Sequence, residues 1–155
     1  MERKNIGTEK ALQKIKYFCS YQERNHQEVK KKLYSFGLYK ADVELLLSKM
    51  IEENYLNEER YALAFAGGRF RIKKWGRVKI RYELKQKRIS EYCIKKALAS
   101  IVEEDYIKAL QKLFEEKKRS QKTEKNIFIK KQKIQSFLMQ RGFEPQLISG
   151  LIQQM

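Results

Sequence analysis

The stretch that decides the fold of this 155-residue chain is IRYELKQKRISEYCIKKALASI, residues 80–101. Its apolar positions have the spacing of two helices joined by a tight turn. The same spacing recurs without a gap in the windows 29–50 and 134–155. A unit of this size cannot bury its apolar face alone, so we expect neighbouring units to stack. Seven columns agree in chemistry across the windows: Val29/Ile80/Ile134, Leu33/Leu84/Leu138, Leu38/Ile89/Phe143, Val43/Ile94/Ile148, Leu46/Ala97/Leu151, Leu47/Leu98/Ile152 and Met50/Ile101/Met155.

The residues around these windows complete three-helix units. Asn25, followed three residues later by Glu28, is a capping-box sequence, and Asn57 and Ser90 suit the N-caps of two further helices. Pro145 fits the first turn of the last helix. The chain has one proline and seven glycines, so few positions interrupt regular structure. The sequence therefore predicts an all-α fold, an elongated, curved array of three tandem three-helix repeats at 9–55, 56–102 and 103–155, after a flexible N-terminal segment at 1–8.

The net charge of +16 is concentrated in two stretches. Residues 69–88 hold ten Lys or Arg and only Glu83 as an acid, and residues 117–133 hold eight bases against Glu124. The rest of the chain is balanced in charge. A localised charge of this kind creates a field that attracts a polyanion or an acidic protein surface.

The central basic stretch includes a predicted helix with a basic stripe. On the helix that begins at about Arg77, the residues Arg77, Arg81, Lys85 and Arg88 fall within about 80° of arc, and the apolar residues lie on a neighbouring face. We expect these charges to be free of internal carboxylates and to contact a partner. A solvated helix face is the alternative interpretation.

Two sets of candidate contact residues follow from this pattern. Trp75, at a helix junction, can stack on a base or anchor in a protein pocket, or it can fill the seam between repeats. Gly67 and Gly68, inside a helical pattern, indicate a close helix approach or a hinge. The partner-contact set is Arg69, Arg71, Lys73, Lys74, Trp75, Arg77, Lys79, Arg81, Lys85 and Arg88, and the secondary basic patch is Lys130, Lys131, Lys133 and Arg141.

The sequence offers no support for catalysis, a metal site or a cofactor. Cys19 and Cys93 lack the spacing of zinc ligands and are expected to be buried, reduced thiols. The single histidine, His26, has no triad partners at a familiar spacing, and no glycine-rich phosphate loop is present. The first twenty residues contain no apolar core of a signal peptide, and no apolar run is long enough for a membrane span. We expect a soluble, cytoplasmic protein that is not an enzyme.

Three segments resemble the RecX family, the small bacterial regulators of the RecA recombinase. Residues 55–58, YLNE, resemble the family's G-Y-L-N/D-D/E motif. Residues 76–90, GRVKIRYELKQKRIS, resemble its G-x-x-R/K-I-x-x-E-L-x-x-K-G-I-S signature, and residues 133–143, KIQSFLMQRGF, are similar to its final-repeat K-x-x-R/K-F-L-x-x-R-G-F/Y segment. The likeness covers residues 9–155. The chain departs from the family at three glycine positions, which here are Asn54, Lys74 and Arg88.

The resemblance implies three tandem three-helix repeats and no cofactor. It also implies a monomer that binds RecA and the RecA–DNA filament and inhibits its ATPase, filament extension and strand exchange. Homologous recombination, DNA repair and the SOS response would be modulated in this way. Some members of the family also bind single- or double-stranded DNA directly, whereas no membrane or small-molecule substrate is implied. The alternative is a helical DNA-binding module that acts on nucleic acid without RecA.

Overall fold

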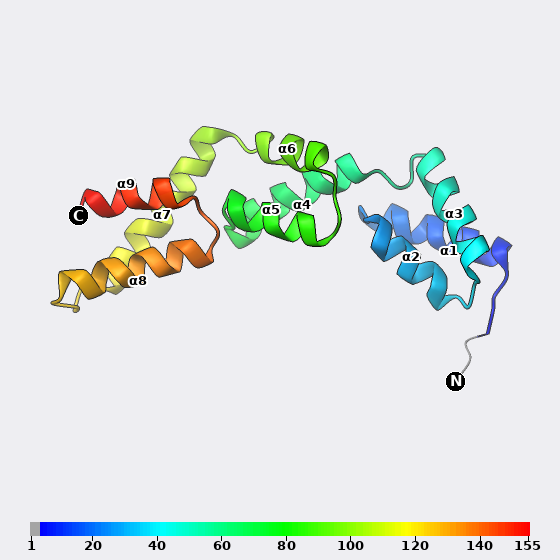
Figure 1. Ribbon diagram of the computed structural model, residues 1–155, viewed down its shortest axis with the longest axis horizontal. Coiled ribbons are helices and arrows are strands. Elements are labelled where there is room, and N and C mark those ends of the chain that lie inside the picture. The colour runs from blue at the N-terminus through cyan, green and yellow to red at the C-terminus, as the bar shows by residue number, and fades with distance from the viewer. Residues whose placement is uncertain (1–3) are drawn as a thin grey trace. The chain divides into compact units, whose positions relative to one another are not determined.

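The computed structural model describes residues 4–155, and within that range it contains nine α-helices and no strand (Figure 1). The predictions of an all-α fold and of three-helix repeats are confirmed. The helices are α1 (Thr8–Tyr21), α2 (His26–Ser35), α3 (Lys40–Glu52), α4 (Glu58–Lys73), α5 (Arg77–Gln86), α6 (Glu91–Ala99), α7 (Glu103–Ser120), α8 (Ile127–Gln140) and α9 (Pro145–Gln153).

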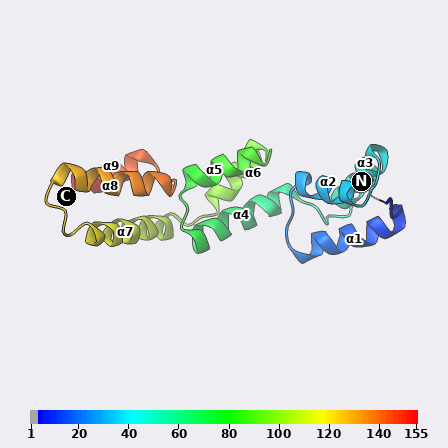
Figure 2. The ribbon, with the colours of Figure 1, turned by 90° about the horizontal axis from the view of Figure 1, so that it is seen from below.

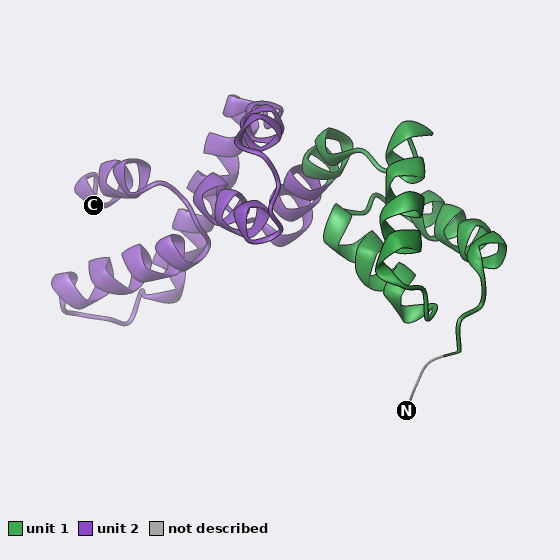
Figure 3. Ribbon diagram, turned by 45° about the vertical axis from the view of Figure 1, so that its right-hand side comes forward, with its two compact units in different colours: residues 1–64 green, residues 65–155 purple. Residues whose placement is uncertain are grey.

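The chain divides into two compact units, Met1–Ala64 and Phe65–Met155, so the division falls inside α4 (Figure 3). Within the first unit, α1 packs on α2 and α3. Within the second, α5 packs on α6, and α8 packs on both α7 and α9 (Figure 2). The repeat boundaries at 55/56 and 102/103 stay predictions.

The repeat columns form the cores. The first four columns are buried in all three windows, from Val29, Ile80 and Ile134 at 0% exposed to Ile89 at 5%. Both cysteines are buried and free, as predicted. Burial raises the pKa of the Cys19 thiol to about 11, although the nearby Arg24 guanidinium acts in the opposite direction.

The predicted caps are present. Asn25 Oδ1 accepts from the Glu28 N–H at 2.8 Å, and Glu28 Oε1 accepts from the Asn25 N–H at 3.2 Å, which completes the capping box. Asn57 Oδ1 accepts from the Arg60 N–H at 2.9 Å, and Ser90 Oγ accepts from the Cys93 N–H at 3.3 Å. Side-chain oxygens therefore satisfy donors at the first turns of α2, α4 and α6.

The flexibility predicted for segment 1–8 stays a prediction, and the described part of this segment makes backbone hydrogen bonds. Residues 1–3 lie outside the described range. The Ile6 N–H donates to the Phe36 carbonyl at 3.1 Å, and α1 begins at Thr8. The polar, basic stretch 117–126 is partly non-helical, because helix α7 ends at Ser120 and α8 begins at Ile127.

The turns that follow α2, α5 and α8 share a left-handed residue. The backbone φ is 83° at Gly37, 59° at Arg88 and 90° at Gly142. Asn54 and Lys74 also have positive φ, at 63° and 59°. The three residues that replace the family's glycines therefore keep the left-handed conformation for which glycine has no steric cost.

The second and third repeats meet through a close backbone contact inside the second unit. The Gly76 N–H donates to the Arg141 carbonyl at 2.7 Å, and the Val78 N–H donates to the Gly142 carbonyl at 2.9 Å. A Cβ on Gly76 would lie 2.3 Å from the Gly142 oxygen, so only glycine fits there. The α8–α9 turn thus satisfies backbone donors at the start of α5.

The close helix approach predicted for the glycine pair of α4 is not present at Gly68, and the predicted hinge stays a prediction. The helix runs unbroken through Gly67 and Gly68. A Cβ on Gly67 would meet the guanidinium of Arg71 at 2.8 Å, and a Cβ on Gly68 would meet nothing within 4 Å. The absent Cβ at Gly67 therefore makes room for the side chain of Arg71, one turn further along the same helix.

Candidate interaction surface of the central repeat

A cluster of aromatic rings and cations joins the end of α4 to α5. Phe65 and Trp75 meet edge to face with their ring centroids 6.3 Å apart. The Arg69 guanidinium lies 4.6 Å from the Phe65 centroid and 5.4 Å from the Trp75 centroid. The ammonium of Lys79 lies 4.4 Å from the Trp75 centroid, and that of Lys87 lies 5.7 Å from Phe65. We call these five residues the Trp75 cluster.

The Trp75 cluster favours a mixed role for the tryptophan. Its ring is half-buried against Phe65 and carries cations on its faces. Cation–π contacts of this kind are each worth about 0.5–1 kcal/mol at exposed sites. They orient positive groups beside an aromatic ring that remains partly open to a partner. Trp75 thus packs on Phe65 of its own repeat, and both its predicted place in the seam between repeats and its contact with a partner stay predictions.

Several cations around this cluster have no carboxylate to neutralise them. Within residues 4–155, no carboxylate lies within 4.0 Å of the charged groups of seven basic residues. Four of them are exposed, and the other three belong to the Trp75 cluster. The exposed ones are Arg71, Lys73, Lys74 and Arg88, and the half-buried ones are Arg69, Lys79 and Lys87.

The expectation that the stripe on α5 carries free charge is wrong for Arg77. Its Nε donates to Glu144 Oε2 at 2.9 Å, and its Nη1 donates to Glu103 Oε2 at 2.7 Å. The guanidinium also lies 3.9 Å from the ring centroid of Tyr106, whose hydroxyl donates to Glu144 Oε1. The Arg77 N–H in turn donates to the Tyr106 hydroxyl oxygen at 2.9 Å. Arg77 therefore joins the second repeat to the third through a polar cluster. We call its four residues, Arg77, Glu103, Tyr106 and Glu144, the latch.

The electrostatics of this latch follow from burial and pairing. Burial disfavours the charged guanidinium, but hydrogen bonds to Glu103 and Glu144 outweigh it and place the pKa of Arg77 above its ordinary value. Burial and the hydrogen bond to Glu144 both raise the pKa of Tyr106. The latch thus holds a charged arginine and a neutral tyrosine throughout the neutral pH range, and it leaves no free positive charge for a partner.

The same expectation is also wrong for Arg81. Its guanidinium donates to Glu91 Oε1, and the Lys85 ammonium lies 3.8 Å from Glu91 Oε2. The hydrogen bond from Arg81 holds the pKa of Glu91 below its usual range. Only Arg88, of the four stripe residues, keeps an unpaired charge among the described residues. The pairings could not be read from the helix pattern, because Glu91 lies on α6 and Glu144 in the turn before α9.

The secondary basic patch is also divided by the structure. Arg141 Nη1 donates to the Lys73 carbonyl at 2.8 Å, so this residue caps the C-terminus of α4. Lys133 lies 3.8 Å from Glu124. Lys130 and Lys131 are half-buried and have no carboxylate within that range among the described residues. The contact of this patch with a partner stays a prediction, and Arg141 has a structural role.

The described residues provide neither a cluster of metal ligands nor a membrane-spanning helix. Residues 4–155 contain no group of three or more His, Cys, Asp or Glu side chains that could hold a metal ion. Over the same range, no helix combines the length and the apolar character that a bilayer crossing requires.

What the central repeat offers chemically is a set of unneutralised donors beside a half-buried tryptophan, which suits phosphate or carboxylate groups. Sequence reasoning did not include Phe65 or Lys87 in the contact set.

Comparison with known proteins places these features in the central and third repeats of a known family. Family models described as "RecX, second three-helix domain" and "RecX, third three-helix domain" match residues 57–98 and 103–152. A regulatory protein RecX from Bacillus cytotoxicus is 30% identical over 145 residues, which cover 93% of this chain and 53% of that protein. Another, from Prosthecochloris aestuarii, is 29% identical over 141 residues, covering 91% of this chain and 90% of that protein.

Solved structures give the same result for the fold. The crystal structure of RecX from Lactobacillus salivarius has a TM-score of 0.83 with 22% identity and 95% coverage of both chains. A crystal structure of a regulatory protein RecX also has a TM-score of 0.83, with 25% identity and coverage of 96% of this chain and 72% of that one. The chain spans about half the length, 53%, of the Bacillus and Geobacillus relatives that it matches.

Proposed function

The chain belongs to the RecX family, and on that basis we propose that it is a non-enzymatic regulator of the RecA recombinase. Its partners in this proposal are RecA and the RecA–DNA filament. Binding would inhibit the ATPase, filament extension and strand exchange, and so modulate recombination, repair and the SOS response. A monomeric state and a cytoplasmic location belong to the same proposal.

The observation that carries the proposal is the set of unneutralised cations of the central repeat. The exposed members Arg71, Lys73, Lys74 and Arg88 are close in the sequence to residues of the Trp75 cluster, and the matched family domain contains all of them. A nucleoprotein filament presents DNA phosphates and acidic protein groups together. Cations that are held beside an aromatic ring and lack internal partners can bind both. A bound regulator would then oppose subunit addition and the subunit movements that accompany ATP turnover.

The test is a titration of the protein against the DNA-dependent ATPase of RecA. We expect substoichiometric amounts to suppress ATP hydrolysis, because one bound regulator restrains a filament of many subunits. Binding to bare DNA should remain weak under the same conditions. An unchanged ATPase in excess protein, with filaments verified by electron microscopy, would reject the proposal.

Charge reversal tests whether the central repeat is the contact. We expect Lys73→Glu with Arg88→Glu to weaken the inhibition about tenfold or more, since two favourable contacts become repulsive. The matched control is Lys95→Glu with Lys112→Glu, which changes the net charge equally at exposed positions outside the contact set. Equal loss in both variants would show that net charge alone matters. Unfolding midpoints in urea check that both variants remain folded.

The alternative, a DNA-binding module that acts without RecA, is favoured by the Trp75 cluster, since aromatic rings with adjacent cations also suit nucleic acid. It predicts tight binding to bare DNA with an affinity that falls steeply with salt concentration. It also predicts that the Lys73/Arg88 reversal abolishes this binding. Under the regulatory proposal, the reversal affects the ATPase at protein concentrations where bare DNA is largely unbound.

A further inference from the structure

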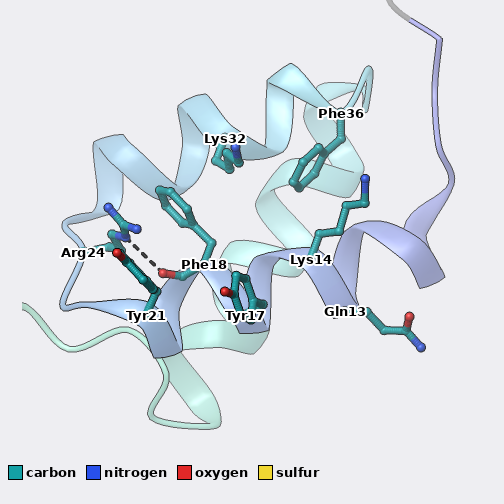
Figure 4. A pocket seen from close by; sticks show the side chains of 8 residues that line it. All are labelled: Gln13, Lys14, Tyr17, Phe18, Tyr21, Arg24, Lys32 and Phe36. Atoms are coloured by element: carbon teal, nitrogen blue, oxygen red, sulfur yellow. Dashed lines mark hydrogen bonds between the residues drawn. The ribbon is translucent and has the colours of Figure 1, made fainter.

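The first unit contains a groove that the proposed function does not use. It lies between α1 and α2, in the part of the chain that precedes both matched family domains, and encloses about 620 Å³ (Figure 4). None of the side chains that line it carries a carboxylate. The lining residues of this α1–α2 groove are Gln13, Lys14, Tyr17, Phe18, Tyr21, Arg24, Lys32 and Phe36.

Two tyrosines of the groove expose most of their surface. Tyr17 and Tyr21 are one helical turn apart on α1 and are 72% and 71% exposed. Their ring centroids are 6.5 Å apart, and the ring planes are inclined by 36°. Figure 4 shows the two rings next to each other along α1. Aromatic rings that are paired and exposed in this way provide a stacking surface for a flat partner.

Cations surround the same groove. The ammonium groups of Lys14 and Lys32 each lie 5.8 Å from the ring centroid of Phe36, and Lys32 also lies 5.5 Å from that of Phe18. The Arg24 guanidinium stacks 3.7 Å from the Phe18 centroid, and its Nε donates to the Phe18 carbonyl at 3.0 Å. The phenylalanine faces are thus occupied by cations, whereas the two tyrosines keep most of their surface open.

The charges differ in how free they are. Arg24 is held by its backbone contact, and its Nη1 lies 3.8 Å from Glu28, so part of its charge is neutralised. Lys14 and Lys32 are exposed, and no carboxylate of the described residues lies within 4.0 Å of either ammonium group. The groove therefore combines two flexible point charges at its rim with two open tyrosine rings.

We propose that the α1–α2 groove binds single-stranded nucleic acid, with unpaired bases on Tyr17 and Tyr21 and phosphates on Lys14 and Lys32. A single strand offers flat apolar rings and anionic groups in alternation, which matches both features of the groove. A duplex keeps its bases stacked inside and offers only phosphates to such a site. An acidic peptide supplies carboxylates for Lys14 and Lys32, but acidic side chains do not stack on exposed tyrosine rings. The proposal does not rest on RecA binding, so its test omits RecA.

The binding test compares strands with and without bases. Fluorescence anisotropy is measured with a labelled oligothymidylate of about six nucleotides, within the usual range of a single-strand site. The comparison strand is abasic and carries the same number of phosphates. We expect Tyr17→Ala with Tyr21→Ala to weaken oligothymidylate binding about tenfold or more, and to leave abasic binding unchanged. The matched control is Tyr39→Ala, since Tyr39 is 77% exposed in the same unit but does not line the groove.

The lysines have a separate signature. Lys14→Ala with Lys32→Ala should lower the salt dependence of oligothymidylate binding by about 0.7 per lost phosphate contact on a logarithmic plot. Lys10→Ala with Lys30→Ala, at exposed positions outside the lining, should not. The double tyrosine variant keeps all lysines, so its salt dependence should match that of the unaltered protein.

Photocross-linking identifies the position on the chain, since the central repeat is also basic. A strand with 5-iodouridine is irradiated with the full chain, and the linked peptides are sequenced by mass spectrometry. We expect a linked peptide that contains Tyr17 or Tyr21. Cross-links confined to the central repeat would overturn the proposal, as would equal affinity for abasic and base-containing strands. Stronger displacement of the strand by a polyglutamate peptide than by unlabelled oligothymidylate would also overturn it and identify a protein-binding groove. Circular dichroism verifies that each variant is folded.

Discussion

Arg88 has a left-handed backbone conformation, which is strained for arginine but not for glycine. Its φ is 59°, and the corresponding turns of the other repeats have Gly37 and Gly142 with φ of 83° and 90°. Those two glycines are also required by space, because a Cβ would lie 2.7 Å from the Lys4 carbonyl oxygen and 2.2 Å from the Lys79 Cβ. Arg88 is exposed, so steric strain of its own backbone is the main cost there.

We predict that Arg88→Gly raises the free energy of unfolding by about 1 kcal/mol, because the left-handed strain is removed. Urea denaturation followed by Trp75 fluorescence measures the change. Arg88→Ala is the control, since it removes the charge and keeps the strain, and it should leave stability nearly unchanged. If Arg88→Gly destabilises the protein, the strain argument fails. Both variants should also weaken RecA inhibition if the charge at this turn contacts the filament.

At the scale of helices, the start of α5 is held by groups distant in the sequence. Its first backbone donors bond to the Arg141 and Gly142 carbonyls and to the Tyr106 hydroxyl. The Arg77 side chain, which is 24% exposed, bonds to Glu103 and to Glu144, the N-cap residue of α9. Arg77, which was predicted to carry a free charge, is instead paired with carboxylates inside the second unit.

We predict that Arg77→Gln and Glu144→Gln each lower the free energy of unfolding by about 1–3 kcal/mol. Arg77→Gln leaves the partly buried Glu144 carboxylate without its arginine, and Glu144→Gln leaves Arg77 with only the more exposed Glu103. The double variant should lose less than the sum, with a coupling of about 1 kcal/mol or more in a double-mutant cycle. Arg119→Gln, at an exposed position on α7, is the control and should be near neutral. Additive losses would show that the latch does not act as a unit.

Local features of this fold could be predicted from the sequence, whereas the partners of the α5 cations could not. Local signals gave the caps at Asn25, Asn57 and Ser90, because a capping residue and its target lie within three positions. The repeat columns gave the buried residues, because apolar periodicity directly reflects burial. The partners of Arg77 are 26 and 67 residues away, and no periodicity encodes which cations they neutralise. The α1–α2 groove was missed for the same reason, since its walls come from two helices whose aromatic residues also fit core positions.

At the scale of the whole molecule, the structure divides into two compact units with separate cores. In the first unit, Leu33 and Val29 belong to a buried cluster that draws on α1, α2 and α3. In the second, Leu138 is 0% exposed, and α8 packs on α7 and α9. Separate cores of this kind permit separate unfolding transitions, so one midpoint need not describe the chain.

We predict that probes in the two units report different urea transitions. Trp75, the only tryptophan, reports on the second unit, and Tyr55→Trp in a Trp75→Phe background reports on the first, since Tyr55 packs against the first core. Leu33→Ala should lower the free energy of unfolding that the Tyr55→Trp probe reports, and Leu138→Ala should lower the one that Trp75 reports. Each loss should be about 2–5 kcal/mol, because a cavity replaces a buried leucine. Each substitution should leave the other probe's midpoint nearly unchanged. If both probes move together in both variants, the chain unfolds as one cooperative unit and the independence of the two cores is refuted.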